Sequence, residues 1–246
     1  KSMIKTYFSS LRIIFYLFIL VLVYVFYLSR DLPSLERLET FDPAMLSTLY
    51  DRNGEVIGEF YIQKRVFVDI EDMPDHLKNA AIASEDKRFY THWGVDLQSF
   101  IRAVVVNVSS MSFRQGFSTL SQQLARNLYK EVGFKDSITR KLKEMITAIQ
   151  IERTYTKDEI LEMYLNTVHF GHGTYGAESA AKRFFNKTAS ELTIGESAML
   201  IGLLPSPANY SPLRNLNKAI GRRSIVLKLM YNLDFISYQE YMENNS

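Results

Sequence analysis

Two stretches of the sequence place a glutamate where it could take part in chemistry. Glu85 opens EDKRFYTHWG, among apolar and aromatic residues, and Glu144 closes RKLKE, among cations. A carboxyl group in an apolar setting can exchange a proton near neutral pH, whereas one among cations stays ionised. Such a pair is typical of acid–base chemistry on an anionic substrate, so both are candidate catalytic residues.

Glu85 is expected on a helix that begins near Pro74. Ile82 precedes it by three positions and Phe89 follows it by four, so the three side chains would share one stripe. This stripe predicts a partly desolvated carboxyl group suited to proton transfer. The alternative is a glutamate paired with the next lysine or arginine on a solvated face. Asp86 would point about 100° away, where it could cap or brace rather than react.

Glu144 is expected on the charged face of a second helix. Arg140 and Lys141 precede it by four and three positions, on the same face. In one interpretation both cations contact a phosphate, while Glu144 orients them or supports the leaving end of the reaction. The other is a surface ion-pair ladder, which would stabilise the fold by only about 0–1 kcal/mol. The buried face of this helix is predicted to comprise Leu142, Met145, Ile146 and Ile149.

Between the two glutamates, the segment GFSTLSQQ brings hydroxyl and amide groups to a predicted helix start. The two hydroxyls fit as helix caps. A helix N-terminus with hydroxyls and an arginine just beyond is also an anion site. The candidate substrate-binding residues of this region are Ser118, Thr119, Gln122, Gln123 and Arg126.

The composition excludes several classes of site. The 246 residues include no cysteine, so neither a disulfide framework nor a cysteine-ligated metal can form. A net charge of +2 argues against a general nucleic-acid binder. His169 and His172 are spaced as metal ligands can be, but Gly171 between them favours a loop and no third ligand is near. No protein-bound metal site is therefore predicted.

The N-terminal region is apolar enough to predict a membrane anchor. Ile13–Leu28 carries no charge or amide and approaches the roughly 20 residues that a bilayer core requires. No small-residue cleavage site follows, so a retained anchor is favoured over a signal peptide. Lys1, Lys5 and Arg12 precede the run, which places the N-terminus in the cytoplasm and everything after Arg30 outside.

Beyond the anchor, the sequence predicts a mainly α-helical fold with one short β-hairpin near its start. Apolar residues alternate over Ser47–Tyr61 around an Asn-Gly pair, which is a strong hairpin signal. Residues 1–30 are expected to form the cytoplasmic tail and transmembrane anchor, 31–45 a linker, and 46–246 a single domain. Capping-box spacing marks four helix starts, at Thr119 with Gln122, Thr156 with Glu159, Thr188 with Glu191, and Thr193 with Glu196.

Five motifs follow one another along this domain. They are Glu85-Asp86 with Phe89, His92 and Gly94; Gly116 with Ser118-Thr119 and Gln122-Gln123; Arg140-Lys141 with Glu144; Ile160-Leu161-Glu162 with Tyr164, Asn166 and Gly171; and LPSPANYSP from Leu204 to Pro212. In this order they resemble the peptidoglycan glycosyltransferases, as in class A penicillin-binding proteins and the monofunctional transglycosylases. The resemblance covers roughly residues 46–243.

The resemblance implies a lysozyme-like helical lobe and a small membrane-facing lobe, with the active cleft between them. The substrate would be lipid II, a disaccharide-pentapeptide on undecaprenyl pyrophosphate. Glu85 would deprotonate the attacking 4-hydroxyl, and inverting transfer would form a β-1,4 bond and release undecaprenyl pyrophosphate. Arg126, Arg140 and Lys141 would stabilise the pyrophosphate, together with a divalent cation, Mg²⁺ or Mn²⁺, and without an organic cofactor.

The same resemblance implies where the protein works and with what. Its partners would be lipid II, the growing glycan strand, membrane lipids and other cell-wall synthesis proteins, and no nucleic acid. It would lie in the bacterial cytoplasmic (inner) membrane as a single-pass protein with the catalytic domain on the outer, periplasmic side. It would also be a target of moenomycin.

Two positions depart from the family pattern. Phe117 stands where the family usually has a second glycine, and Asp136 stands where it often has a basic residue, with Lys135 beside it as a candidate phosphate contact. Phe117, with Met111 and Phe113, is also predicted to dip into the outer leaflet, where the lipid-linked substrate resides.

Two other functions stay open from the sequence alone. A glycan-cleaving enzyme, such as a lytic transglycosylase or lysozyme, also uses one glutamate in a helical lobe, but it needs no cationic pyrophosphate site. A non-catalytic membrane scaffold would leave Glu85 in its apolar setting unexplained. Ser84-Glu-Asp-Lys87 matches the first motif of penicillin-sensitive transpeptidases by coincidence, because the other motifs are absent. Whether the chain belongs to a longer bifunctional protein is not decided by the sequence.

Overall fold

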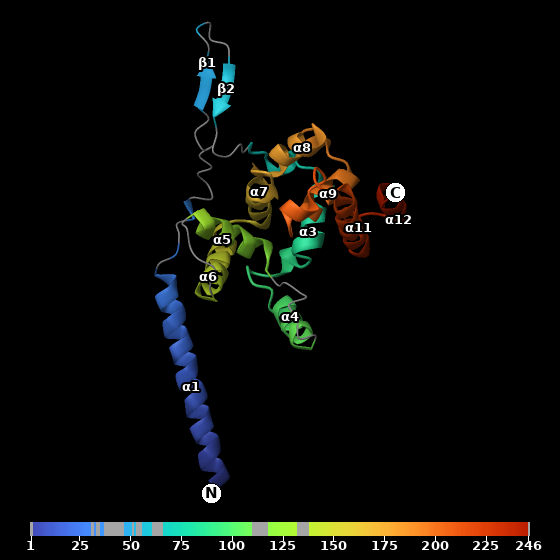
Figure 1. Cartoon of the computed structure of the whole chain (residues 1–246). Helices are drawn as coiled ribbons and strands as arrows, with labels where there is room; N and C mark the ends of the chain where they lie inside the picture. The colour runs from blue at the N-terminus through green and yellow to red at the C-terminus, as the bar shows by residue number, and fades with distance from the viewer. Residues whose placement is uncertain are drawn as a thin grey trace.

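The structure is a computed structural model, which describes residues 2–30, 32, 35–36, 47–50, 52, 56–60, 66–109, 118–131 and 138–245. A long N-terminal helix, α1 (Ser2–Ser29), and an antiparallel hairpin of β1 (Ser47–Tyr50) and β2 (Val56–Phe60) extend in opposite directions from a body of packed helices (Figure 1). The fold is mainly α-helical with one hairpin near its start, as the sequence predicts.

The body contains nearly all of the remaining elements. Its first half comprises η1 (Ile70–Asp72), α3 (Asp75–Glu85), η2 (Phe89–Thr91), α4 (Leu97–Ser109), α5 (Leu120–Glu131), α6 (Ile138–Thr154) and α7 (Lys157–Thr167). Its second half comprises β3 (His169–Gly171), β4 (Thr174–Tyr175), α8 (Ala177–Phe185), η3 (Ala189–Glu191), α9 (Ile194–Leu203), α10 (Pro207–Tyr210), α11 (Leu216–Asn232) and α12 (Tyr238–Asn245). β3 and β4 form a second, very short antiparallel pair.

Two packed groups of helices form the core. In one group α3 and α11 pack on α9, whose residues from Ser197 to Leu203 are all buried. In the other, α5 packs on α6 and α7. A helix that is apolar on all sides belongs in the centre of a body, which explains the place of α9. The end of α3 and the start of α5 meet where the two groups join, and this junction holds the first two sequence motifs.

Three of the four predicted capping boxes are confirmed. Those at Thr156, Thr188 and Thr193 have both reciprocal hydrogen bonds, although the one at Thr188 begins the short η3 rather than an α-helix. The fourth forms only in part: Gln122 N donates to the Thr119 hydroxyl oxygen at 3.2 Å, but the Gln122 side chain donates to Gly94 O instead. The reason is that this helix start is buried against the first motif.

The predicted stripe of Ile82, Glu85 and Phe89 is wrong in its last member. α3 begins after Pro74 as predicted but ends at Glu85, so Phe89 lies in the separate η2. The backbone leaves the helix at Asp86, which has φ −155° and ψ 75°. Glu85 is therefore a helix-terminal residue, and its carboxylate projects from the end of α3 rather than from its side.

The predicted buried face of α6 is also wrong. Leu142, Met145, Ile146 and Ile149 are half-buried, whereas the buried positions are Lys143, Glu144, Thr147, Ala148 and Ile151. Apolar periodicity places charges outward on a helix that faces water. Here the charged face packs against α5, and ion pairing of Glu144 offsets the cost of its burial.

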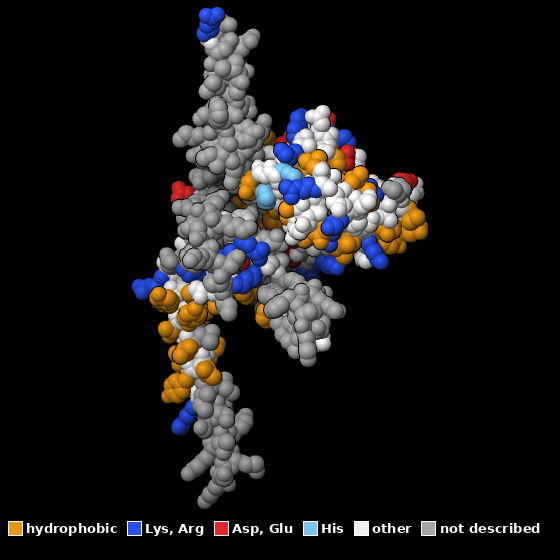
Figure 2. Space-filling view, in the orientation of Figure 1, with side chains coloured by type: hydrophobic (Ala, Val, Ile, Leu, Met, Phe, Trp, Pro, Cys, Tyr) orange, Lys and Arg blue, Asp and Glu red, His pale blue; other side chains and the backbone are white. Residues whose placement is uncertain are grey.

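The apolar N-terminal segment forms a helix, but this helix does not meet the requirements of the predicted membrane anchor. α1 is 28 residues long, and its large apolar side chains at 15–20 and 22–27 are exposed (Figure 2). The predicted transmembrane helix is not found, because no helix in the described residues is long and apolar enough to cross a membrane. The predicted domain boundaries at residues 30 and 45 stay predictions.

Asn166 on α7 holds the segment that enters α3. Its amide oxygen accepts from Val68 N at 3.0 Å and its amide nitrogen donates to Val68 O at 2.8 Å. One turn earlier, Glu162 Oε2 accepts from Ile70 N at 2.6 Å. Two side chains at i and i+4 thus pair with the backbone of residues 68–70 as a neighbouring strand would.

Replacing Asn166 with alanine should lower the free energy of unfolding by about 2 kcal/mol, because two backbone groups lose their partners in a partly buried site. Urea unfolding would measure the loss. Asn209→Ala is the matched control, since Asn209 is exposed and donates only to Ser206 Oγ at 2.8 Å; it should change stability by no more than about 0.5 kcal/mol. Equal stability of the two variants would contradict a holding role for Asn166.

Candidate active site

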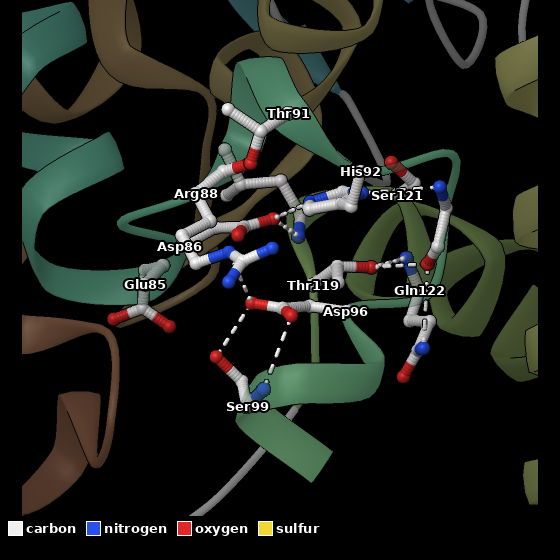
Figure 3. A network of polar contacts seen from close by, with 12 residues as sticks. Glu85, Asp86, Arg88, Thr91, His92, Asp96, Ser99, Thr119, Ser121 and Gln122 are labelled. Atoms are coloured by element: carbon white, nitrogen blue, oxygen red, sulfur yellow. Dashed lines mark hydrogen bonds and ion pairs between the residues drawn. The ribbon is translucent and has the colours of Figure 1, made fainter.

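The Glu85 carboxylate lies at the end of α3 and accepts a hydrogen bond on each oxygen. Ser84 Oγ donates to Oε1 at 3.2 Å, and Gln123 Nε2 on α5 donates to Oε2 at 2.9 Å. The residue is half-buried. In Figure 3 its side chain points away from the polar network that its neighbours form. Glu85 is thus held in place but remains open to a substrate hydroxyl.

Asp86 braces the site, one of the two roles open to it from the sequence. Its Oδ2 accepts from His92 Nε2 at 2.8 Å and from the backbone N–H of Leu120, the first residue of α5, at 2.9 Å. Asp86 and His92 face each other in Figure 3. Gly94 N donates to His92 Nδ1 at 3.1 Å, so the imidazole acts as donor on one nitrogen and acceptor on the other. The predicted anion site at the start of α5 is therefore occupied by the protein's own carboxylate.

Gly94 allows the first motif to approach α6 closely. Its φ is +102°, and a Cβ added there would lie 2.7 Å from the carbonyl oxygen of Ala148. The Gly94 carbonyl accepts from Thr119 Oγ1 at 2.7 Å and from Gln122 Nε2 at 3.3 Å. Any other residue here would push apart the elements that carry Glu85 and Glu144.

A further set of buried contacts was not predicted from the sequence. Glu152 on α6 accepts from Ser121 Oγ at 2.5 Å and pairs with Lys157 Nζ at 2.7 Å. Lys157 also donates to His92 O at 2.8 Å and lies 4.6 Å from the centre of the Phe89 ring. These side chains join α5, α6 and α7 behind the site. No local spacing signals them, because the partners are brought together only by the fold.

Glu144 is the centre of a cationic cluster. It is 0% exposed, and three cations surround it: Arg126 Nε at 3.5 Å, Arg140 Nε at 3.3 Å and Lys141 Nζ at 3.4 Å. The surface ion-pair ladder is therefore excluded. A carboxylate enclosed in this way orients the cations, since it has no exposed surface with which to meet a substrate.

The side chains of the cations in this cluster are partly exposed to solvent. Their exposed fractions are 15–32%, and Lys and Arg gather over α5 and the start of α6 in Figure 2. Lys141 Nζ also donates to Ser118 Oγ at 2.8 Å and to Gln122 Oε1 at 3.1 Å. Burial, only partly offset by Glu144, lowers the pKa of Lys141. An anion bound at the exposed part of this cluster would favour the charged form of this lysine.

Two adjacent glutamines link the cationic cluster to Glu85. Gln122 accepts from Lys141, and Gln123 donates to Glu85. α5 therefore carries one amide toward Lys141 in the cationic cluster and one toward Glu85. A half-buried carboxylate and a cationic cluster thus lie on either side of one helix turn, an arrangement suited to a transfer reaction with an anionic leaving group.

Most of the predicted site residues are brought together by these contacts. They form two neighbouring sets of contacts on either side of α5. One set joins Glu85 to Gln123, and the other joins Ser118, Thr119, Gln122, Arg126, Arg140, Lys141 and Glu144. Lys135 lies outside the described residues, as do Phe117, Asp136 and the apolar Met111 and Phe113. In the described part of the chain, no group of three or more His, Asp or Glu side chains is arranged to hold a metal ion.

Comparison with known proteins identifies relatives over most of the chain. The family model described as Transglycosylase matches residues 53–231. The chain is 39% identical over 239 residues to penicillin-binding protein 1A of Aquifex aeolicus, covering 97% of this chain and 33% of the relative. It is 44% identical over 209 residues to penicillin-binding protein 1A of Neisseria gonorrhoeae, covering 85% of this chain and 26% of that protein. The chain thus spans a third or less of the length of these relatives.

A solved structure supports the fold. The crystal structure of penicillin-binding protein 1A from Haemophilus influenzae matches with a TM-score of 0.50 and 24% identity, covering 83% of this chain and 21% of that one. At this identity the likeness concerns the fold alone.

Proposed function

The chain belongs to the peptidoglycan transglycosylase family, and from this premise we propose that it polymerises lipid II into glycan strands. The observation that carries the proposal is the pairing of a half-buried, hydrogen-bonded Glu85 with three cations held around the buried Glu144. The first can accept a proton, and the second can hold a pyrophosphate.

In the proposed reaction, Glu85 takes the proton of the 4-hydroxyl on the incoming lipid II. The hydroxyl oxygen forms a bond to the anomeric carbon of the growing strand, and the bond from that carbon to the pyrophosphate oxygen breaks. The leaving electron pair goes to the pyrophosphate. Attack from the face opposite the leaving group inverts the anomeric configuration and produces a β-1,4 bond, by the logic of inverting glycosidases with a sugar hydroxyl in place of water.

The cationic cluster stabilises the charge that gathers on the departing pyrophosphate. Arg126, Arg140 and Lys141 are fixed in advance by Glu144 and Ser118, so little reorganisation is needed as the charge develops. Lys135 is proposed as a fourth contact from its place in the sequence. The described residues do not fit a protein-bound Mg²⁺ or Mn²⁺ here, because the carboxylate in the cluster is already enclosed by three cations. No step is therefore assigned to a metal.

A cleavage enzyme is the main alternative, and the cationic cluster argues against it, because hydrolysis or lytic cleavage of a glycan releases no pyrophosphate. Purified protein incubated with labelled lipid II decides between the two. Growth of long glycan strands, blocked by moenomycin, supports the proposal. Shortening of added glycan without consumption of lipid II would support cleavage, and binding without any turnover would support a scaffold.

The proposal also places the protein at a membrane, where an undecaprenyl chain resides. Two exposed apolar surfaces fit this role: α1, and a stripe on α4 formed by Leu97, Ile101 and Val105, which are 55%, 61% and 61% exposed. The spacing of four residues puts the stripe on one face of α4. α4 lies on the side of the body from which α1 extends (Figure 1). We place the body on the outer face of the cytoplasmic membrane, in keeping with the cations that precede the apolar part of α1.

Replacing Leu97, Ile101 and Val105 together with serine should reduce liposome binding several-fold in a chain lacking residues 1–30, because an interfacial helix binds through its buried apolar area. Liposome co-sedimentation measures the effect. The matched control replaces Leu213, Leu216 and Ile225, which are also exposed but lie before and on α11. Equal sedimentation of the two triple variants would exclude α4 as a membrane contact.

A further inference from the structure

The orientation of the Glu85 carboxylate depends on a hydrogen-bonded chain that begins in the interior of the body. The Tyr164 hydroxyl donates to Gln123 Oε1 at 3.3 Å, and Gln123 Nε2 donates to Glu85 Oε2 at 2.9 Å. The three residues come from α7, α5 and α3. The chain thus runs from a fully buried hydroxyl to a half-buried carboxylate.

Only one arrangement of the Gln123 amide satisfies both neighbours. An ionised carboxylate can only accept hydrogen bonds, so the amide must face Glu85 with its nitrogen and Tyr164 with its oxygen. A tyrosine hydroxyl can donate or accept, so Glu85 decides which way the amide faces, and Tyr164 then holds the amide oxygen by donating to it. Its side chain is 0% exposed, and burial first, then the nearby Glu85 charge, raises the pKa of its hydroxyl well above the ordinary value.

Removing the hydroxyl would leave the Gln123 amide oxygen without the donor that holds it. The Gln123 side chain would then be held only at its nitrogen, and it could rotate away from the carboxylate, which would lose a well-placed donor. The ring alone would still fill its place in the core, since Tyr164 packs among residues that are themselves fully buried, such as Leu124 and Ile160. The hydroxyl is therefore separable from the packing.

We propose that Tyr164 acts through Gln123 as a positioning residue, holding the Glu85 carboxylate in the orientation that accepts a proton from the incoming sugar hydroxyl. The inference rests on the proposed role of Glu85 as base. It assigns a function in the reaction to a side chain that otherwise resembles an ordinary core aromatic residue.

The test is Tyr164→Phe, measured as lipid II polymerisation across pH. We expect kcat to fall about 3- to 30-fold at neutral pH, with KM nearly unchanged. The acid limb of the kcat profile should move to higher pH, because a carboxylate that loses a donor to its charged form holds its proton more strongly. A purely structural role would lower the melting temperature and leave the position of the acid limb unchanged.

Two further variants make the result specific. Tyr90→Phe is the matched control, because Tyr90 also donates to a side-chain oxygen at 3.3 Å, that of Asp158, but on the surface; its pH profile should stay that of the parent. Gln123→Met keeps the length of the side chain without its hydrogen bonds and should reproduce the shift of the acid limb. In the Gln123→Met background, Tyr164→Phe should add nothing further, since residues that act through one another are not additive.

The outcomes separate this inference from the function on which it rests. A parent protein that forms no polymer overturns the proposed function and this inference with it. A parent that polymerises while Tyr164→Phe keeps its kcat and acid limb overturns the inference alone. The inference alone is also overturned if Tyr164→Phe has its full effect in the Gln123→Met background, because Tyr164 would then not act through Gln123.

Discussion

Glu85→Gln is expected to reduce lipid II polymerisation by at least about 100-fold, the lower end of what a general base contributes. Glutamine has nearly the same size and can still accept from Gln123 through its amide oxygen, while its amide nitrogen donates to the Ser84 hydroxyl, but it cannot take up a proton at neutral pH. Since Glu85 is half-buried at the end of α3, the fold does not depend on its charge. Polymerisation of labelled lipid II should therefore be lost, while the melting temperature should stay that of the parent protein.

Asp86→Asn provides the contrast for this prediction. Asp86 is buried, and its Oδ2 accepts from both His92 Nε2 and the first N–H of α5. Loss of its charge should lower the melting temperature and reduce activity only as far as α5 is displaced. Near-parental turnover by a folded Glu85→Gln variant would exclude the assigned base. If Asp86→Asn alone loses activity without losing stability, Asp86 rather than Glu85 would be the base.

The elements of the fold were largely predictable because their signals are local. An Asn-Gly pair in the sequence predicts the hairpin of β1 and β2, and three capping boxes mark real helix starts. The end of α3 was not predictable in this way. The chain leaves the helix at Asp86, whose side chain bonds to His92 and to a backbone N–H 34 positions away. A contact of that sequence separation leaves no trace in periodicity.

Which residues form the site was easier to predict from the sequence than how deeply they are buried. Arg140, Lys141 and Glu144 were expected on one helix face, and they are. Their burial was not expected, because a charged face normally faces water. What reverses this expectation is Arg126 from α5, which brings a third cation and covers Glu144. Tyr164 belongs to the fourth sequence motif, but the partner of its hydroxyl comes from another helix and could not be inferred.

The environment of Glu144 leads to the second large expected effect. Glu144→Gln keeps the volume of the side chain but leaves three cations around a neutral amide. Removal of one member of a buried ion pair costs about 3–5 kcal/mol, and here the cost should lie near the lower end, because the cations are partly exposed. We expect a clear drop in melting temperature together with a large loss of polymerisation, since repelling cations no longer hold one geometry.

Inorganic pyrophosphate should partly reverse this loss of stability. If the cluster binds the leaving group, the anion supplies the negative charge that Glu144→Gln lacks, and binding to the folded state alone raises the melting temperature. The rise should be greater for Glu144→Gln than for the parent, and smaller for Arg140→Ala, which has lost a cation. Glu196→Gln breaks an ion pair of 2.8 Å with Lys187 away from the cluster and should respond to pyrophosphate as the parent does. A rise of equal size in all four proteins would show that pyrophosphate binds elsewhere, and the three cations would then serve only to bury Glu144.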